Sequence, residues 1–338
     1  MNQPYQLGII GCGDFLRIQV AGLKNSKLVQ VKSLFDVDAT RAQHYANEVG
    51  GNVVASAEAI LEDKSIDIVC PFVPPWLRKD LMLRAAQAGK HILATKPLAA
   101  SASDAQEIVA GVKNVRAAVI YKRTGEGWME GLRQLFNSGE IGHLALFRHD
   151  WNHHYPQWNN WALDVAKNGG PFMDAEIHQL NAARHLMGRP ITRAIMYSEK
   201  LAHPDLTCPD TEMMKLDFSG NGSALLFITW ANDLEVRSKE GNFRESVETF
   251  YMVSDQGWRV TREGTPGAFH IMATRDGKKQ TYPAYQFPAS VFDRFALAVR
   301  SGEAFPPDLA SVEMARDDIV LVRSLLAQPG KPMEVKGM

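Results

Sequence analysis

The first third of the chain alternates between short apolar runs and segments with a helical pattern. The apolar runs are typical of buried strands, and the segments between them have the spacing of one helix face. This alternation predicts a parallel sheet covered by helices on both faces. The expected strands are 5–10, 28–36, 67–72, 91–95 and 116–121, and the expected helices are 14–23, 40–49, 76–89 and 101–112.

From about Ile141 the pattern changes to strand-like segments separated by turn residues. Asn221-Gly222 joins two of them and is a strong hairpin signal. We therefore expect a largely antiparallel second sheet, and two domains at 1–122 and 123–338 of this 338-residue chain. The expected strands of the second part are 143–151, 191–200, 212–219, 222–232, 246–255 and 257–263, and its expected helices are 172–187, 288–301 and 308–327.

Composition and charge exclude several classes of protein. The chain is 45% hydrophobic and 22% charged, with a net charge of −1, so it lacks the basic density of a nucleic-acid binder. No apolar stretch approaches the roughly 18–20 residues of a membrane span, and the N-terminus lacks the pattern of a secretory signal. Cys12, Cys70 and Cys208 are far apart. We expect a cytoplasmic protein with no metal site and no nucleic-acid or membrane partner.

A glycine turn follows the first expected strand. Gly11 and Gly13 would allow backbone N–H groups at a helix N-terminus to approach a pyrophosphate. The usual third small residue is replaced by Leu16, which weakens the match. Asp36 ends the next strand at the distance expected of a carboxylate that binds a ribose 2′-hydroxyl, and Asp38 would repel a 2′-phosphate. The turn therefore favours NAD over NADP, and the alternative is that Asp36 only caps the next helix.

A lysine stands just after another expected strand, in Thr95-Lys96-Pro97. Ligands bind at the carboxyl edge of a parallel sheet, so Lys96 would lie beside a cofactor. A lysine there can hold a substrate hydroxyl group or take its proton. Taken alone, Lys96 is more simply explained as a surface residue of a loop.

The pair Asp174 and His178 follows the turn Gly169-Gly170-Pro171. A spacing of four places both side chains on one face of a helix. Three interpretations are open: a metal-ligand pair, a proton-transfer pair or a solvated surface pair. A metal site would draw its further ligands from His149, His153 and His154. The helix would have an apolar stripe of Met173, Ile177, Leu180 and Met187 beside a polar stripe of Asp174, His178, Asn181 and His185.

An aromatic segment lies upstream of this pair. Trp151, Tyr155, Trp158 and Trp161 offer flat apolar faces that suit the C–H surface of a sugar, and His153 offers a hydrogen bond. The alternative is that these rings fill an interface. Arg123 follows the last strand of the first domain and could contact a substrate or a phosphate.

Together these segments resemble the Gfo/Idh/MocA family, the group of glucose–fructose oxidoreductase and inositol dehydrogenase. The resemblance covers nearly the whole chain, and its strength lies in the order and spacing of the segments. They are GIIGCG (8–13), FDVDATRA (35–42), DIVCPFVPPW (67–76), AGKHILATKPLA (88–99), IYKR (120–123), SGEIGHL (138–144) and GGPFMDAEIHQLNAARHLMG (169–188).

The resemblance implies an α/β protein, with an N-terminal Rossmann domain and a C-terminal α/β domain built on a large, open, mostly antiparallel sheet. It implies that Lys96, Asp174 and His178 are catalytic, with His178 as general base. Two further residues depart from the family pattern, since Thr95 replaces a Glu and Arg78 stands where a His is common.

We therefore expect an NAD(P)-dependent oxidoreductase acting on a secondary alcohol of a sugar, polyol or sugar acid, assembled as a homodimer or homotetramer. The alternatives are a glycosidase with bound NAD and a non-catalytic regulator that binds NAD and a sugar. The expected cofactor contacts are Gly11, Gly13, Asp14, Phe15, Leu16, Asp36, Arg41, Val73, Pro74, Thr95 and Lys96. The expected substrate contacts are Tyr121, Arg123, Trp151, His153, Tyr155 and Trp161.

Overall fold

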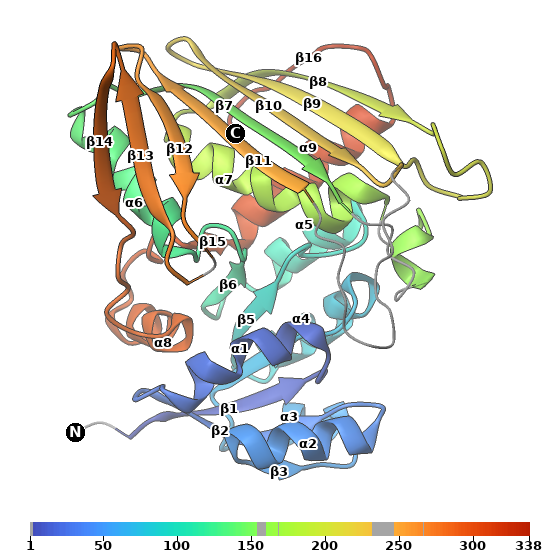
Figure 1. Cartoon of the computed structure of the whole chain (residues 1–338). Coiled ribbons are helices and arrows are strands. Elements are labelled where there is room, and N and C mark those ends of the chain that lie inside the picture. Colours follow the sequence, from blue (N-terminus) through green and yellow to red (C-terminus); the bar gives the residue numbers. More distant parts are fainter. Residues whose placement is uncertain (1–2, 154–159, 168, 232–246, 266) are drawn as a thin grey trace, which may run out of the picture. The chain divides into compact units, whose positions relative to one another are not determined.

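The chain forms two compact units (Figure 1). The computed structural model describes residues 3–153, 160–167, 169–231, 247–265 and 267–338. The first unit combines Met1–Tyr121 with Phe287–Arg316, and the second combines Lys122–Gln286 with Asp317–Met338. The first unit thus takes in a C-terminal segment, and the functional division of the chain after residue 122 stays a prediction.

The first unit is built on a seven-stranded sheet. Its strands are β1 (Tyr5–Ile10), β2 (Val29–Phe35), β3 (Asn52–Val53), β4 (Ile68–Pro71), β5 (His91–Thr95), β6 (Ala117–Ile120) and β15 (Leu309–Ser311). The order is β15-β6-β5-β4-β1-β2-β3, and all pairs are parallel except β15 with β6. Strands β4 and β6 are buried throughout, as a sheet covered on both faces requires.

Helices connect these strands, and their boundaries follow local capping. Asp38 and Ser101 each accept a backbone N–H bond from the first turn of the helix that follows. The helices are α1 (Asp14–Lys24), α2 (Ala39–Val49), α3 (Ala57–Glu62), η1 (Pro75–Leu77), α4 (Arg78–Gln87), α5 (Ala102–Gly111) and α8 (Val291–Ser301). The expected alternation of strand and helix is confirmed, although β3 and α3 were not predicted.

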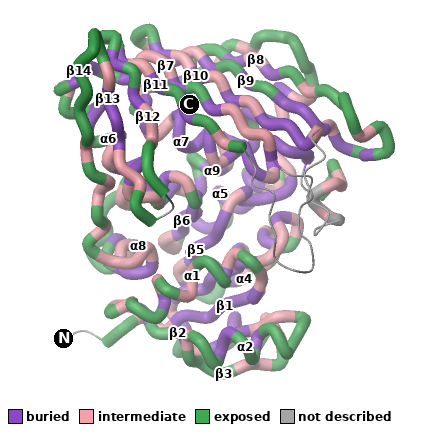
Figure 2. Tube along the Cα trace, in the orientation of Figure 1, coloured by how far each residue is buried: buried purple, intermediate pink, exposed green. Residues whose placement is uncertain are grey.

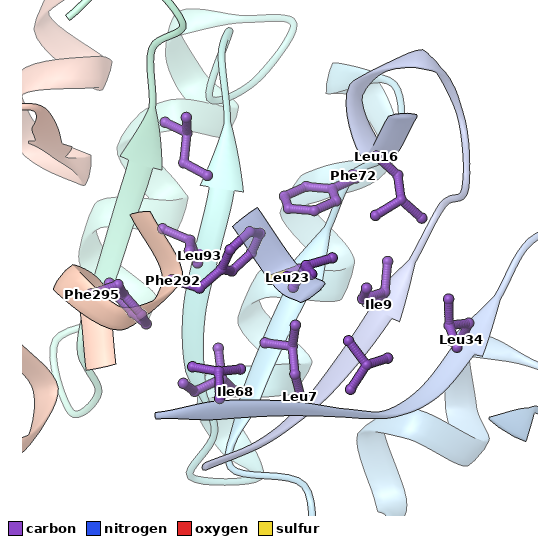
Figure 3. Packing of buried hydrophobic residues seen from close by; sticks show 14 of the residues in the cluster. Leu7, Ile9, Leu16, Leu23, Leu34, Ile68, Phe72, Leu93, Phe292 and Phe295 are labelled. Carbon is purple, nitrogen blue, oxygen red and sulfur yellow. The ribbon is translucent and has the colours of Figure 1, made fainter. Parts of the chain in front are cut away.

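One hydrophobic core joins α8 to the N-terminal sheet. Phe292 and Phe295 pack in the same buried cluster as Leu7, Ile9 and other strand residues (Figure 3). The Asp293 carboxylate also accepts hydrogen bonds from the backbone N–H groups of Lys27 and Leu28, just before β2. These contacts explain why residues far apart in the sequence form one unit.

The second unit contains a nine-stranded sheet. Its strands are β7 (Leu144–Asn152), β8 (Ile191–Glu199), β9 (Thr211–Phe218), β10 (Gly222–Thr229), β11 (Val247–Ser254), β12 (Arg259–Glu263), β13 (His270–Arg275), β14 (Lys278–Pro283) and β16 (Met333–Glu334). The order is β14-β13-β12-β11-β7-β10-β9-β8-β16. Only β7 and β10 are parallel neighbours among these pairs. The predicted fold class, a parallel sheet followed by a mostly antiparallel one, is confirmed.

The expected hairpin connects β9 to β10. Asn221 has φ 65°, a conformation that asparagine tolerates better than most residues, and Gly222 pairs with Phe218 across the turn. The sequence pattern missed α6 (Gly127–Ser138), β13, β14, β15 and β16.

Helices of the second unit contact its sheet. Helix α6 packs against β13 and β14, and α7 (Ile177–Met187) packs against β7 and β10. Preceding α7 are the short helices η2 (Asn160–Leu163) and η3 (Phe172–Glu176), and α9 (Val312–Leu326) follows β15. Within the described chain, no helix is long and apolar enough to cross a membrane.

The strands of this sheet alternate between buried and exposed positions (Figure 2). In β9, Glu212, Met214 and Leu216 are buried, whereas Met213 and Lys215 between them are exposed. One face of the sheet is therefore covered by the unit's own helices, and the other presents side chains to solvent.

Candidate functional site

The glycine turn lies between β1 and α1 in the first unit. Gly11 has φ +97°, and a Cβ atom there would lie 2.6 Å from the carbonyl oxygen of Phe72. Gly13 precedes the helix, and nothing lies within 4 Å of a Cβ placed on it. The turn thus combines a tight backbone contact with open space in front of a helix N-terminus, as a pyrophosphate site requires.

Asp36 connects this turn to the next helix. Its Oδ2 accepts a hydrogen bond from Cys12 N–H at 2.7 Å, and its Oδ1 accepts one from Asp38 N–H at 2.9 Å. Asp38, and not Asp36, caps α2. Each oxygen of a carboxylate has two lone pairs, so Asp36 can still accept bonds from ribose hydroxyl groups. The geometry fits the predicted ribose contact.

The predicted cofactor contacts near this turn differ in exposure. Arg41 lies 3.9 Å from Asp36 and 3.5 Å from Asp38. The fold therefore brings a guanidinium group close to Asp36, although no arginine stands next to Asp36 in the sequence. Phe15 packs edge-on against Phe72, and the Leu16 side chain is fully buried in the core. Asp14 is exposed, Val73 contacts the Gly11 position, and Pro74 is half-buried.

The loop after β5 presents Lys96 and is held by a buried arginine. Arg78 Nη1 donates to the carbonyl oxygen of Thr95 at 2.7 Å and also to that of Pro97. Lys96 N–H donates to Ile120 O, and the Lys96–Pro97 peptide bond is cis. Burial lowers the pKa of Arg78 to about 9, opposed by the nearby Tyr121. Arg78, which departs from the family pattern, therefore fixes the backbone on both sides of Lys96.

In the second unit, Asp174 lies in a π-helical turn rather than in a regular α-helix. This turn is η3, and α7 follows it directly with His178 in its first turn. The Ile177 N–H donates to Phe172 O, the i→i+5 bond that defines the turn. Such turns are rare in proteins, and those that occur are often found at functional sites. Asp174 and His178 are both half-buried.

The start of η3 is bonded to a buried carboxylate on β9. Glu212 Oε2 accepts a hydrogen bond from Phe172 N–H at 2.7 Å, and Oε1 accepts one from Ser198 Oγ at 3.1 Å. Burial raises the pKa of Glu212 to about 7, although both hydrogen bonds and Arg323 oppose the shift.

The end of η3 is bonded to β7. Glu176 Oε1 lies 2.7 Å from His149 Nδ1, and neither side chain is exposed. His149 Nε2 lies 3.2 Å from Glu248 on β11. Burial disfavours the imidazolium, but the two flanking carboxylates outweigh it and raise the pKa of His149. In the part of the chain that the structure describes, Glu176 Oε2 has no hydrogen-bond partner.

The surface interpretation of the polar stripe does not fit these positions. Asn181 is buried, the His185 side chain is almost fully buried, and the apolar stripe faces the core as expected. Of the further ligands named for a metal site, His149 binds two carboxylates, His153 accepts from the indole N–H of Trp230, and His154 lies outside the described residues. Among residues 3–153, 160–167, 169–231, 247–265 and 267–338, no three His, Cys, Asp or Glu side chains are grouped to hold a metal ion.

The predicted substrate contacts have different environments. Arg123 is ion-paired with Glu126 at 3.0 Å and with Glu248, so its guanidinium is already bound. Tyr121 is fully buried, Trp151 packs edge-on against His153, and Trp161 is half-buried. Tyr155 and Trp158 lie outside the described residues. Their roles in substrate binding stay predictions.

Sequence reasoning missed Arg78, Glu176 and Glu212 as structural partners of the site. The sequence did contain a signal for Glu212. It occupies the same alternating face of the strand as Met214 and Leu216, and that face is buried. A charged residue on a buried face of a strand must have a partner. No comparable pattern marks Arg78 or Glu176.

The parallel sheet, the glycine turn and Asp36 are the features of a dinucleotide-binding fold. Two family models match the chain: the oxidoreductase family with an NAD-binding Rossmann fold over residues 5–122, and the GFO/IDH/MocA C-terminal domain over residues 129–242. The chain belongs to this GFO/IDH/MocA family of oxidoreductases.

The chain is similar to several characterised proteins. It is 28% identical over 195 residues to dTDP-3,4-didehydro-2,6-dideoxy-alpha-D-glucose 3-reductase of Saccharopolyspora spinosa, covering 57% of this chain and 59% of that protein. It is 27% identical over 225 residues to inositol 2-dehydrogenase 1 of Saccharopolyspora erythraea, covering 61% and 64%. The structure of levoglucosan dehydrogenase in complex with NADH has a TM-score of 0.78 and 17% identity, covering 99% and 100%. In the reductase and the inositol dehydrogenase, the matched region spans about three-fifths of each protein's length.

The two glycines of the turn are expected to respond differently to alanine. Gly11→Ala should lower the melting temperature, because φ +97° is strained for alanine and the new Cβ would clash with Phe72 O. Gly13→Ala should fold with nearly unchanged stability and bind NAD at least tenfold more weakly, because its Cβ enters the open space. Calorimetry and NAD titration measure both effects, and equal melting temperatures for the two variants would contradict this interpretation.

Glu212→Gln is expected to flatten the pH dependence of stability. The pKa of Glu212 rises from its ordinary 4.5 to about 7 on folding, so the folded state binds more protons between these values. The free energy of unfolding therefore falls as pH rises through this interval, by as much as about 3 kcal/mol. Among the described residues, Arg323 and Cys208 are titratable groups that also interact with Glu212.

Denaturant unfolding at pH 5.5 and pH 8.5 measures this effect. The stability of the glutamine variant relative to the wild type should be greater at pH 8.5 than at pH 5.5. The same difference at both pH values would show that Glu212 does not titrate in this range.

Proposed function

We propose that the protein is an NAD(P)-dependent dehydrogenase or reductase acting on a secondary alcohol of a sugar, polyol or sugar acid. The observation that carries the proposal is the pair Asp174 and His178, half-buried on a rigidly bonded helical turn, in a chain that also has the glycine turn and Asp36. The relatives named as sugar and inositol oxidoreductases support the substrate class.

In this proposal, His178 acts as the general base. One of its ring nitrogens takes the hydroxyl proton of the substrate as the C–H bond at the same carbon breaks. Imidazole ordinarily titrates near pH 6.5, which suits proton exchange close to neutrality. The bound nicotinamide supplies the acceptor for the hydride.

Lys96 is assigned to the reacting hydroxyl group, and Asp174 to the base or to a neighbouring hydroxyl group. The Lys96 ammonium would stabilise the negative charge that develops on the substrate oxygen. Asp174, one turn before His178, would orient the base or accept a hydrogen bond from a neighbouring hydroxyl. The Arg78 side chain donates hydrogen bonds to backbone carbonyl groups and so limits the movement of the loop that carries Lys96. These bonds support the role proposed for Lys96.

For the cofactor we propose NAD in preference to NADP. In this proposal the ribose binds beside Asp36, and the carboxylates of Asp36 and Asp38 would repel a 2′-phosphate. Arg41 is paired with both of them and offsets one of their two negative charges, so the group of three keeps a net negative charge.

For assembly we propose a homodimer or homotetramer. The support is the exposed face of the nine-stranded sheet, which presents Tyr197, Met213 and Tyr251 to solvent. Light scattering of the purified protein tests the proposal: a native mass of two or four chains is expected, and a monomer at micromolar concentration would contradict it.

A panel of polyols, sugars and sugar acids, each with NAD and with NADP, tests the activity directly. The expected result is an increase in absorbance of the reduced cofactor with at least one alcohol and tighter binding of NADH than of NADPH. Release of free sugar from a glycoside without net reduction would instead identify the bound-NAD glycosidase. Cofactor binding without turnover on any substrate would favour the regulator.

His178→Ala is expected to lower kcat by roughly 10²- to 10⁴-fold, the usual contribution of a general base. The Kd for NAD should change less than threefold, since the nucleotide turn is untouched. His270→Ala is the matched control, because His270 lies on β13 beside Glu263 and has no assigned role. Wild-type turnover in His178→Ala would contradict the assignment of the base.

A further inference from the structure

The turn that carries Asp174 is attached to the sheet of the second unit at both of its ends. We propose that Glu212, at one end, and the Glu176–His149 pair, at the other, are positioning residues that set the geometry of Asp174 and His178. The inference rests on the proposed function, and it assigns no direct contact with substrate to any of the three.

At the first end, Glu212 replaces an intrahelical partner that the turn lacks. The Phe172 N–H is among the first donors of a helical segment and has no carbonyl one turn earlier within that segment. Glu212 Oε2 accepts from it at 2.7 Å. The carboxylate is itself held by Ser198 on the neighbouring strand β8, so the start of the turn is fixed to two strands.

At the second end, Glu176 lies between Asp174 and His178 in the sequence. Its 2.7 Å contact with His149 ties this part of the backbone to β7, and Glu248 holds the opposite side of the imidazole from β11. Glu176 and His149 have no exposed side-chain area. A buried, charge-assisted bond of this kind is stronger than a neutral one and costly to break.

The two attachments matter because a π-helical turn competes with the α-helical register. If the Ile177 N–H moved from the carbonyl of Phe172 to that of Met173, the residues before it would rotate about the helix axis. Asp174 would then change its direction relative to His178, which already belongs to α7. Bonds at both ends of the turn oppose that change.

Paired variants of Glu212 test the proposal. Glu212→Ala removes the acceptor of the Phe172 N–H and is expected to lower kcat at least tenfold, while KM changes less and the Kd for NAD stays within threefold of the wild type. Glu212→Gln keeps an amide oxygen for Phe172 and an N–H for Ser198, so it should retain kcat within about threefold. Glu176→Ala, which releases the other end of the turn, should behave as Glu212→Ala does.

Asp293→Ala is the control for a general loss of stability. Asp293 is also a buried carboxylate that accepts backbone N–H bonds, but it lies on α8 in the first unit and binds the residues just before β2. Its replacement should lower the melting temperature and leave kcat nearly unchanged.

Hydrogen exchange of the peptide spanning residues 169–178 provides a readout that needs no substrate. Glu212→Ala and Glu176→Ala should each speed exchange in this peptide at least tenfold, and Glu212→Gln and Asp293→Ala should not. Unchanged exchange in folded Glu212→Ala and Glu176→Ala overturns the positioning role. So does wild-type kcat in both variants, or loss of kcat in Glu212→Gln equal to that in Glu212→Ala.

The two proposals can fail separately. If His178→Ala keeps full turnover while exchange in the 169–178 peptide follows the expected pattern, the assignment of the base fails and the attachment of the turn stands. If His178→Ala is inactive and exchange is unchanged, the base stands and the positioning role fails.

Discussion

The structure of the second unit depends on the pairing of carboxylates that its fold removes from water. An unpaired buried carboxylate is very unfavourable, so each one must find a donor during folding. Glu212 takes the N–H of Phe172, and Glu176 takes His149. These two requirements determine where the π-helical turn meets the sheet. The positions of Asp174 and His178 therefore follow from the pairing of two other residues, Glu212 and Glu176.

In the first unit, buried charged side chains are paired with backbone N–H and carbonyl groups. The almost fully buried Asp36 binds the N–H of Cys12, and buried Arg78 binds the carbonyl groups on either side of Lys96. Both side chains fix loops at the carboxyl edge of the parallel sheet, where ligands bind in folds of this class. In each unit, a buried charged side chain thus holds the backbone next to a residue of the proposed chemistry.

Much of the fold was predictable because it depends on local periodicity. Alternating apolar runs and helical segments were enough to predict the first sheet, and Asn221-Gly222 was enough to place the hairpin between β9 and β10. The short strands β3 and β16 were not predicted, because two residues are too few to show an alternating pattern. The return of α8 to the first unit depends on the distant packing of Phe292 and Phe295, which local patterns do not encode. The same holds for the π-helical turn, since its register is set by Glu212 and Glu176.

The central claim is that hydride passes between a substrate carbon and the nicotinamide. The most direct test uses the best alcohol of the substrate panel with deuterium at its carbinol carbon, followed by mass spectrometry of the reduced cofactor. The wild-type protein is expected to transfer one deuterium to the reduced nicotinamide. Product formation with no deuterium in the cofactor would contradict it.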